Sequence, residues 1–226
     1  MEINSETKLY GSFSQKAGNL GCKVFNTAFQ HLNINAIYKS FSIKDIMKTV
    51  EAARILNFQA FAVSMPFKIE VLRYVDIISE ECKTIGAANT IINNDGVLTA
   101  YNTDVYAASK ALHMVVVHGT LINHKKLVIL GKGGYSKAVQ YAAKNVVGIK
   151  HSKIEIITRN NWDDIKETKD SVIYNCTPVE NIEVDKSNYF IDCITTTVWG
   201  KRLSEWQASK QFEMYTGQKY PFTTIY

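Results

Sequence analysis

Strand-like and helix-like patterns of apolar residues alternate along the first part of the chain. Runs rich in aromatic and β-branched residues at 8–13 and 35–42 predict two strands. Between them, apolar residues recur every fourth position from Leu20 to Leu32, which predicts a helix. A second helix is predicted over 42–57. We expect Ser42 to be its N-cap, because a serine hydroxyl can accept from an unpaired amide of the first turn.

The pattern continues with a strand, a hairpin and a helix. The almost continuously apolar run 58–65 is typical of a central parallel strand that is covered on both faces. Residues 87–104 predict a hairpin that turns at Asp95-Gly96, and a helix is predicted over 105–119. Alternating strands and helices predict an α/β protein with a parallel sheet.

A second unit opens with a strand at 127–130 that runs into a glycine-rich loop and a helix. The loop reads G-x-G-x-x-S from Gly131 to Ser136, one residue away from the usual dinucleotide-binding pattern. Glycines there let backbone amides at the helix N-terminus approach a pyrophosphate. The motif alone is also compatible with an ordinary strand–turn–helix that binds nothing.

The strand predicted over 153–160 gives the loop a context. It ends in Thr158-Arg159-Asn160, where an NAD-binding protein usually has an acidic residue on the ribose hydroxyls. An arginine at this place suits a 2′-phosphate, so we expect NADP(H) as the cofactor. The alternative is an exposed arginine at a strand end.

Composition limits the class of protein. The chain has 226 residues, 46% of them hydrophobic and 21% charged, which is a globular composition. No apolar run approaches the roughly 20 residues that cross a bilayer, and the first residues do not resemble a secretory signal. The four cysteines are far apart, as expected of free thiols in the cytoplasm. We predict a cytoplasmic protein without a membrane anchor.

Charge points to a small anionic ligand. The net charge is +5 and the pI is about 8.9, but the basic residues are spread along the chain. Without a dense basic run, a nucleic-acid partner is not expected. The histidines are scattered as well, so no metal site is predicted. The hairpin at Asp95-Gly96 and the edge strands could pair between subunits, which would give a homodimer.

Six motifs in order resemble one family. They read "KLYG", "AFQHLNINAIYKSF", "VSMPFK", "GAANTIINNDGVLTAYNTD", "ILGKGGYSKAV" and "QASKQFEMYTGQ", and they are similar to shikimate dehydrogenases, most of all to the divergent shikimate dehydrogenase-like branch. The resemblance implies a substrate domain at 1–104, completed by a C-terminal helix at 203–226 that packs back on it. It implies a Rossmann-type NADP-binding domain at 105–202 and the reversible reduction of 3-dehydroshikimate by NADPH.

The resemblance also implies a catalytic pair, Lys68 and Asp104. The chemistry fits, because hydride addition to a ketone develops negative charge on oxygen, which a nearby donor must stabilise or protonate. A carboxylate beside the ammonium keeps it charged and oriented. The alternative for Lys68 is a solvated charge, the usual state of a lysine.

The remaining site residues follow from the same motifs. The expected substrate contacts are Ser64, Asn89, Asn102, Gln207 and Asn19. The expected cofactor contacts are Gly131, Gly133, Gly134, Tyr135, Ser136, Thr158, Arg159, Asn160, Asn175, Thr177 and Gly200. For the serines and asparagines, turn or cap chemistry is the alternative.

The chain departs from the family pattern in three places. Asn19 and Gly21 replace a Ser-x-Ser pair that grips the substrate carboxylate in the family, Thr195 stands near the position of a tyrosine, and the stretch 192–200 is short. A missing covering helix would expose apolar sheet or require a neighbour. Two other functions therefore stay open: a non-catalytic or vestigial NADP-binding protein, and the same chemistry on quinate or another polyol.

Overall fold

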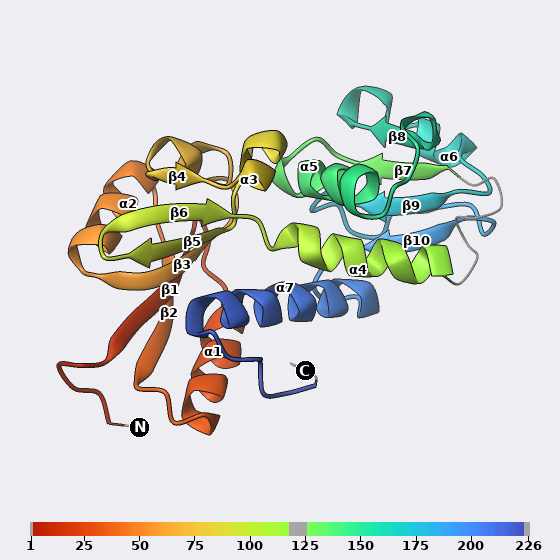
Figure 1. Cartoon of the computed structure of the whole chain (residues 1–226). Coiled ribbons are helices and arrows are strands. Elements are labelled where there is room, and N and C mark those ends of the chain that lie inside the picture. The colour runs from red at the N-terminus through yellow and green to blue at the C-terminus, as the bar shows by residue number, and fades with distance from the viewer. Residues whose placement is uncertain (1, 118–125, 224–226) are drawn as a thin grey trace. The chain divides into compact units, whose positions relative to one another are not determined.

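The structure is a computed structural model that describes residues 2–117 and 126–223. It divides into two compact units, which Figure 1 shows. Unit 1 comprises Met1–Thr103 and Ala208–Tyr226, and unit 2 comprises Asp104–Gln207. Among the described residues, no helix has both the length and the apolar character needed to cross a bilayer.

A six-stranded sheet forms the centre of unit 1, in the order β2-β1-β3-β5-β6-β4. The first three of these strands are parallel, whereas β5 runs antiparallel to both β3 and β6. The sheet is therefore mixed: the prediction of parallel pairing holds for β2-β1-β3 and for the short β6-β4 pair, and fails at β5. The strands are β1 (Lys8–Ser14), β2 (Ala36–Ser42), β3 (Phe58–Val63), β4 (Ile77–Ile78), β5 (Thr90–Asn94) and β6 (Val97–Tyr101).

The predicted hairpin is confirmed as β5 and β6 (Figure 1). Its two turn residues, Asp95 and Gly96, have φ of 50° and 90°. Two consecutive residues at positive φ are typical of the tight turn whose twist matches that of antiparallel strands. The aspartate–glycine pair in the sequence was therefore sufficient to place this turn.

Helices cover both faces of this sheet. They are α1 (Leu20–His31), α2 (Ile46–Ile55), the 3₁₀-helix η1 (Glu70–Arg73) and α3 (Glu80–Ile85). The prediction of Ser42 as the N-cap of α2 is wrong. The helix begins four residues later, where the side chain of Asp45 accepts from the backbone amide of Lys48. Ser42 ends β2, and its hydroxyl accepts from the backbone amide of Ala17 at 3.0 Å.

Each face of the sheet has its own core. On one face, α2 contributes Ile46 and Val50 to a cluster with Phe13 and Phe61. On the other face, α1 and the last turns of α7 (Val198–Thr216) pack together. This second cluster contains Val24, Phe25, Phe29, Phe212 and Tyr215. The C-terminal helix thus packs on the N-terminal domain, as the fold-class prediction states, although the helix ends at Thr216.

Unit 2 is built on a four-stranded parallel sheet in the order β10-β9-β7-β8. Its strands are β7 (Leu127–Leu130), β8 (Ile154–Ile157), β9 (Val172–Asn175) and β10 (Tyr189–Asp192). Its helices are α4 (Asp104–Val117), α5 (Gly134–Tyr141), the π-helix η2 (Ala142–Val146), the 3₁₀-helices η3 (His151–Lys153) and η4 (Arg159–Asn161), and α6 (Asp164–Glu167). The end of the predicted helix 105–119 lies outside the described residues.

One face of the unit 2 sheet has little helix over it. Val128, Leu130 and Ile173 are nevertheless almost completely buried there. They are covered by Ile165 of the four-residue α6 and by partly buried side chains of irregular segments, Trp162, Ile182 and Val184, and Phe190 of β10 packs in the same cluster. The exposed apolar sheet that the short C-terminal region predicted is therefore not found on this face.

We predict that Phe212→Ala destabilises unit 1. The side chain is 0% exposed and contacts the rings of Phe25 and Phe29, so its removal leaves a cavity. The expected loss is about 3–5 kcal/mol in the free energy of unfolding, measured by urea titration. The control is the exposed Gln218, just beyond the helix. Gln218→Ala should change the free energy of unfolding by less than about 0.5 kcal/mol. Equal effects would contradict the packing described here.

Candidate functional site

The predicted substrate residues of unit 1 follow strands that end at one edge of its sheet. Ser64 comes after β3, and Asn102 comes after β6. Asn89 precedes β5, which runs antiparallel to its neighbours and so begins at this same edge. Backbone hydrogen bonds connect the three places: Val63 donates to the carbonyl of Asn89 at 2.9 Å, and Asn89 donates to the carbonyl of Tyr101 at 3.1 Å.

Lys68 joins this edge through its backbone. It lies in the turn between β3 and η1, and its carbonyl accepts from the amide of Ala88 at 2.8 Å. The predicted strand 58–65 ends two residues early, at Val63, because the chain turns there. Lys68 is half-buried, unlike the fully exposed lysine that the alternative assumed. The structure thus brings the lysine turn beside the residues that precede Asn89.

The side chain of Asn89 is 2% exposed, and its oxygen accepts more than one hydrogen bond. Oδ1 accepts from the backbone amide of Thr103 at 2.9 Å and from the hydroxyl of Thr90 at 2.7 Å. Asn102 is similarly buried, and its Nδ2 donates to the carbonyl of Ala87 at 3.0 Å. Both asparagines therefore stabilise the local backbone, which is the alternative role that the sequence left open.

Asn19 and Gly21 stand at the start of α1. Asn19 is the N-cap residue, but within the described part of the chain its exposed side chain makes no capping hydrogen bond. A Cβ at Gly21 would lie 2.8 Å from the ring of Tyr38, which stacks on Phe25 with ring centroids 4.4 Å apart. A serine at position 21 would therefore require the Tyr38 ring to move.

In unit 2, the glycine-rich loop follows the central strand β7 and leads into α5. Gly131 has φ of +99°, and a Cβ there would lie 2.9 Å from Cγ2 of Thr177, so a glycine is required. Gly133 is the extended N-cap residue of α5. Apart from the neighbouring residues of the chain, no described atom lies within 4 Å of a Cβ built on Gly133, so the loop leaves room beside the amides of Gly134 and Tyr135.

Ser136, at the third position of the motif, is fully buried and has a hydrogen-bonding role. Its hydroxyl donates to the carbonyl of Gly131 at 2.6 Å and accepts from Nε2 of Gln140 at 3.3 Å. The serine therefore closes the loop with a bond that glycine or alanine could not make. Its departure from the usual motif has a structural explanation.

Tyr135 and Asp104 lie near the same buried tyrosine. The hydroxyl groups of Tyr135 and Tyr174 are 2.9 Å apart. Burial, followed by the charges of neighbouring groups that include Asp104, raises the pKa of both phenols well above the usual value. Asp104 is 5% exposed and is the first residue of α4, where the helix dipole stabilises a carboxylate.

The predicted cofactor residues after β8 form a small cap. The side chains of Thr158 and Asn161 form a capping box around η4, which begins at Arg159. Arg159 and Asn160 are exposed. Because β7 and β8 are adjacent parallel strands, this cap and the glycine loop lie at the same edge of the sheet.

Asn175, Thr177 and Gly200 have structural partners. Asn175 is 0% exposed; its Nδ2 donates to Oδ1 of Asp192 at 2.9 Å, and its Oδ1 accepts from Thr177. A Cβ at Gly200 would lie 1.9 Å from the carbonyl oxygen of Ile194. These contacts are sufficient to explain why asparagine, threonine and glycine stand at these positions, whether or not they also contact a cofactor.

The motifs predicted Gln207 as a substrate contact and did not identify Gln211. Gln207 is the half-buried last residue of unit 2. Gln211, one turn later, is 3% exposed, and its Nε2 donates to the carbonyl of Asn89 and to Oγ1 of Thr90. A glutamine beside the apolar Phe212 on the buried face of a helix was the available signal.

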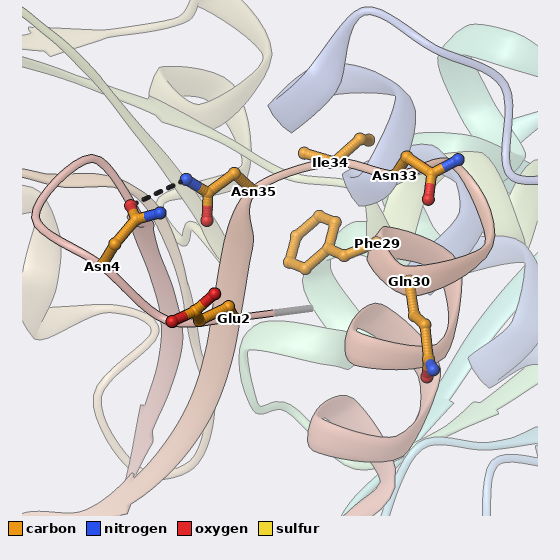
Figure 2. A pocket seen from close by; sticks show the side chains of 7 residues that line it. All are labelled: Glu2, Asn4, Phe29, Gln30, Asn33, Ile34 and Asn35. Atoms are coloured by element: carbon orange, nitrogen blue, oxygen red, sulfur yellow. Dashed lines mark hydrogen bonds between the residues drawn. The ribbon is translucent and has the colours of Figure 1, made fainter.

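A separate cavity of about 560 Å³ lies at the opposite, N-terminal end of β2. Figure 2 shows its lining, with the Nδ2 group of Asn35 bonded to Oδ1 of Asn4. The cavity contains none of the predicted site residues. Among the described residues, no group of three or more His, Cys, Asp or Glu side chains could hold a metal ion.

Comparison with known proteins relates the chain to one family. Residues 19–91 match the family model described as the shikimate dehydrogenase substrate binding domain. The chain is 41% identical over 140 residues to the shikimate dehydrogenase (NADP(+)) of Alkaliphilus oremlandii, covering 61% of this chain and 48% of the relative. It is 32% identical over 198 residues to that of Bacillus cereus, covering 84% and 69%.

The solved structure of a shikimate 5-dehydrogenase-like protein has the same fold. Its TM-score is 0.81 at 27% identity, with 99% of this chain and 96% of that chain covered. In three of the curated relatives, 35–41% identical, the chain spans only about half of the relative's length, 48–56%.

We predict that Gly200→Ala destabilises the protein and that Gly133→Ala does not. The new methyl group at position 200 would clash with a backbone oxygen, which no rotamer change can move. Gly200→Ala should therefore lower the free energy of unfolding by at least about 1–3 kcal/mol. Gly133 has open space and an unstrained φ of −74°, so Gly133→Ala should leave the melting temperature within about 2 °C. Differential scanning calorimetry measures both, and a tolerated Gly200→Ala would contradict the close approach.

Proposed function

The chain belongs to the shikimate dehydrogenase family, and on that premise we propose that it transfers a hydride reversibly between NADP(H) and shikimate or a related cyclic hydroxy acid. The observation that carries this proposal is the edge of the unit 1 sheet, where hydrogen bonds connect the turn of Lys68 with the starts and ends of three strands. Ser64, Asn89 and Asn102 lie at this edge.

In this proposal the ammonium of Lys68 donates a proton to the oxygen at which negative charge develops. In the reverse direction, a Lys68 that has lost its proton accepts one from the substrate hydroxyl as the hydride leaves for NADP. Asp104 supplies the carboxylate that keeps the lysine charged. The side-chain amides of Asn89 and Asn102, the hydroxyl of Ser64 and the amide of Gln207 bind the hydroxyl groups of the ring.

The glycine loop of unit 2 fits a dinucleotide in this proposal. The open space at Gly133, the extended N-cap and the start of the eight-residue α5 leave backbone amides available to a pyrophosphate. The bound NADP(H) supplies the hydride. Arg159 is exposed at the end of the neighbouring strand, which suits it to a 2′-phosphate.

One observation concerns how the substrate carboxylate would be bound. At the start of α1, Gly21 offers no hydroxyl, and the ring of Tyr38 lies where a side chain would begin. Recognition of the substrate carboxylate therefore depends on Asn19 and on backbone amides at the helix start. Because this contact departs from the family pattern, quinate or another polyol stays the second candidate. The cytoplasmic location and the homodimer stay predictions.

We expect Lys68→Ala to abolish turnover and to leave cofactor binding almost unchanged. Loss of a general acid–base group typically reduces kcat by about 10²–10⁴. The measurement is the absorbance of NADPH when purified protein is mixed with NADP and shikimate, with quinate and NAD in parallel. NADP binding is followed separately by isothermal titration calorimetry.

The matched control is Lys83→Ala, which removes an exposed lysine of α3 that pairs with Glu80. It should turn over like the wild type. Wild-type turnover by a folded Lys68→Ala protein would overturn the role of Lys68. Cofactor binding without turnover of any cyclic hydroxy acid by the wild type would favour the non-catalytic protein.

Arg159 makes a separate prediction about cofactor choice. Because a charge-assisted bond to a phosphate contributes about 1.5–3 kcal/mol, NADP should bind at least about tenfold more tightly than NAD. Arg159→Ala should remove most of that difference, whereas Arg202→Ala, at an exposed arginine of α7, should not. Equal affinities of the wild type for the two dinucleotides would disprove the role of Arg159.

A further inference from the structure

The buried amide of Gln211 connects the C-terminal helix to the start of β5. Its Nε2 donates to the backbone carbonyl of Asn89 at 3.2 Å and to Oγ1 of Thr90 at 2.9 Å. Gln211 is 3% exposed and Thr90 is 0% exposed. Burying an amide is unfavourable unless it is hydrogen-bonded, so these two bonds are what make a glutamine acceptable at this position.

Backbone groups fix the orientation of both side-chain amides. The carbonyl of Asn89 can only accept, so the Gln211 atom that faces it must be the nitrogen. The backbone amide of Thr103 can only donate, so the Asn89 atom that faces it, at 2.9 Å, must be the oxygen. Neither amide can be flipped without losing a bond.

The hydroxyl of Thr90 gives this network a direction. Thr90 Oγ1 accepts from Gln211, so its single proton is left for an acceptor, and Oδ1 of Asn89 lies 2.7 Å away. The hydrogen bonds thus run from Gln211 through Thr90 to the oxygen of Asn89. The hydroxyl of Thr103 lies 3.2 Å from Thr90 Oγ1 and can donate or accept there, so Gln211 and Thr103 together hold the Thr90 hydroxyl in this rotation.

The consequence is chemical. Oδ1 of Asn89 accepts from the amide of Thr103, from the hydroxyl of Thr90 and, at 3.2 Å, from the hydroxyl of Thr103. A carbonyl oxygen has two lone pairs, so its capacity as an acceptor is used. Any hydrogen bond from this side chain to a ligand is therefore a donation from Nδ2, a group that can donate two hydrogen bonds.

We propose that Gln211 is a positioning residue that, through Thr90, holds Asn89 as a hydrogen-bond donor toward an oxygen atom of the substrate. The proposal rests on the proposed function for the role of Asn89 in binding a cyclic hydroxy acid. It adds that the partner atom on the substrate accepts, as a hydroxyl, carbonyl or carboxylate oxygen does.

The test uses Gln211→Met, which keeps the length of the side chain and removes the amide, and Thr90→Val, which replaces the hydroxyl with a methyl group. Each variant should lower kcat/KM for shikimate at least about tenfold relative to the wild type, which corresponds to the loss of roughly one buried hydrogen bond. The KM for NADP should stay within about twofold of the wild-type value. Thr90→Ser keeps the hydroxyl and should restore kcat/KM. The double variant should be little worse than either single variant, because the two residues act in series.

Tyr10→Phe is the matched control. The Tyr10 hydroxyl donates to the carbonyl of Tyr215 at 3.3 Å, so this variant also removes a buried hydrogen bond between the sheet and α7, away from Asn89. It should lower stability and leave kcat/KM unchanged. If Tyr10→Phe lowers kcat/KM as much as Gln211→Met does, the effect is merely structural and the proposal fails.

A second readout needs no turnover. The side-chain amide signals of Asn89 in a ¹H–¹⁵N spectrum, assigned by their loss in Asn89→Asp, should shift or broaden in Gln211→Met and Thr90→Val but not in Thr90→Ser. Unchanged signals in both variants would overturn the proposal even if the enzyme is active. A wild-type protein inactive on every acid would refute the proposed function, and these signals would still decide the positioning. If Gln211→Met does not fold, the Thr90 pair decides alone.

Discussion

The edge of unit 1 depends on the hydrogen bonding of four residues, 87–90. This segment accepts from or donates to the turn of Lys68, the end of β3, the end of β6 and the helix α7. It contains no charged residue, and most of its bonds use the backbone. The geometry of the polar side chains here is therefore a consequence of strand pairing, which is stiff, rather than of side-chain contacts alone.

The parts of the fold predicted best were those with a local cause. The turn at Asp95-Gly96 follows from two residues that tolerate positive φ, and the strand, loop and helix around Gly131 follow from a pattern within twenty residues. The N-cap of α2 was misplaced because Ser42 and Asp45 are both good capping residues. The choice between them came from pairing, since Ser42 continues the ladder of β2 with β1.

The residues of the candidate site could be predicted from the sequence, but the hydrogen bonds that their side chains make could not. The motifs identified Asn89, Asn102 and Asn175, yet spacing cannot show that their amides bond to nearby backbone and side chains. Gln211 was missed because its partners are more than 120 residues away in the chain. Contacts at that separation are decided by tertiary packing, which a local pattern does not contain.

Unit 1 is discontinuous in the chain, and this has a consequence for how the protein is made. Residues 208–226 complete a core whose other half, the face of α1 with Phe25 and Phe29, is synthesised nearly 200 residues earlier. On a ribosome that adds roughly 5–20 residues per second, this aromatic face stays without its final cover for about ten seconds or more. During that interval all of unit 2 is translated, so the second unit of the chain can be complete before the first.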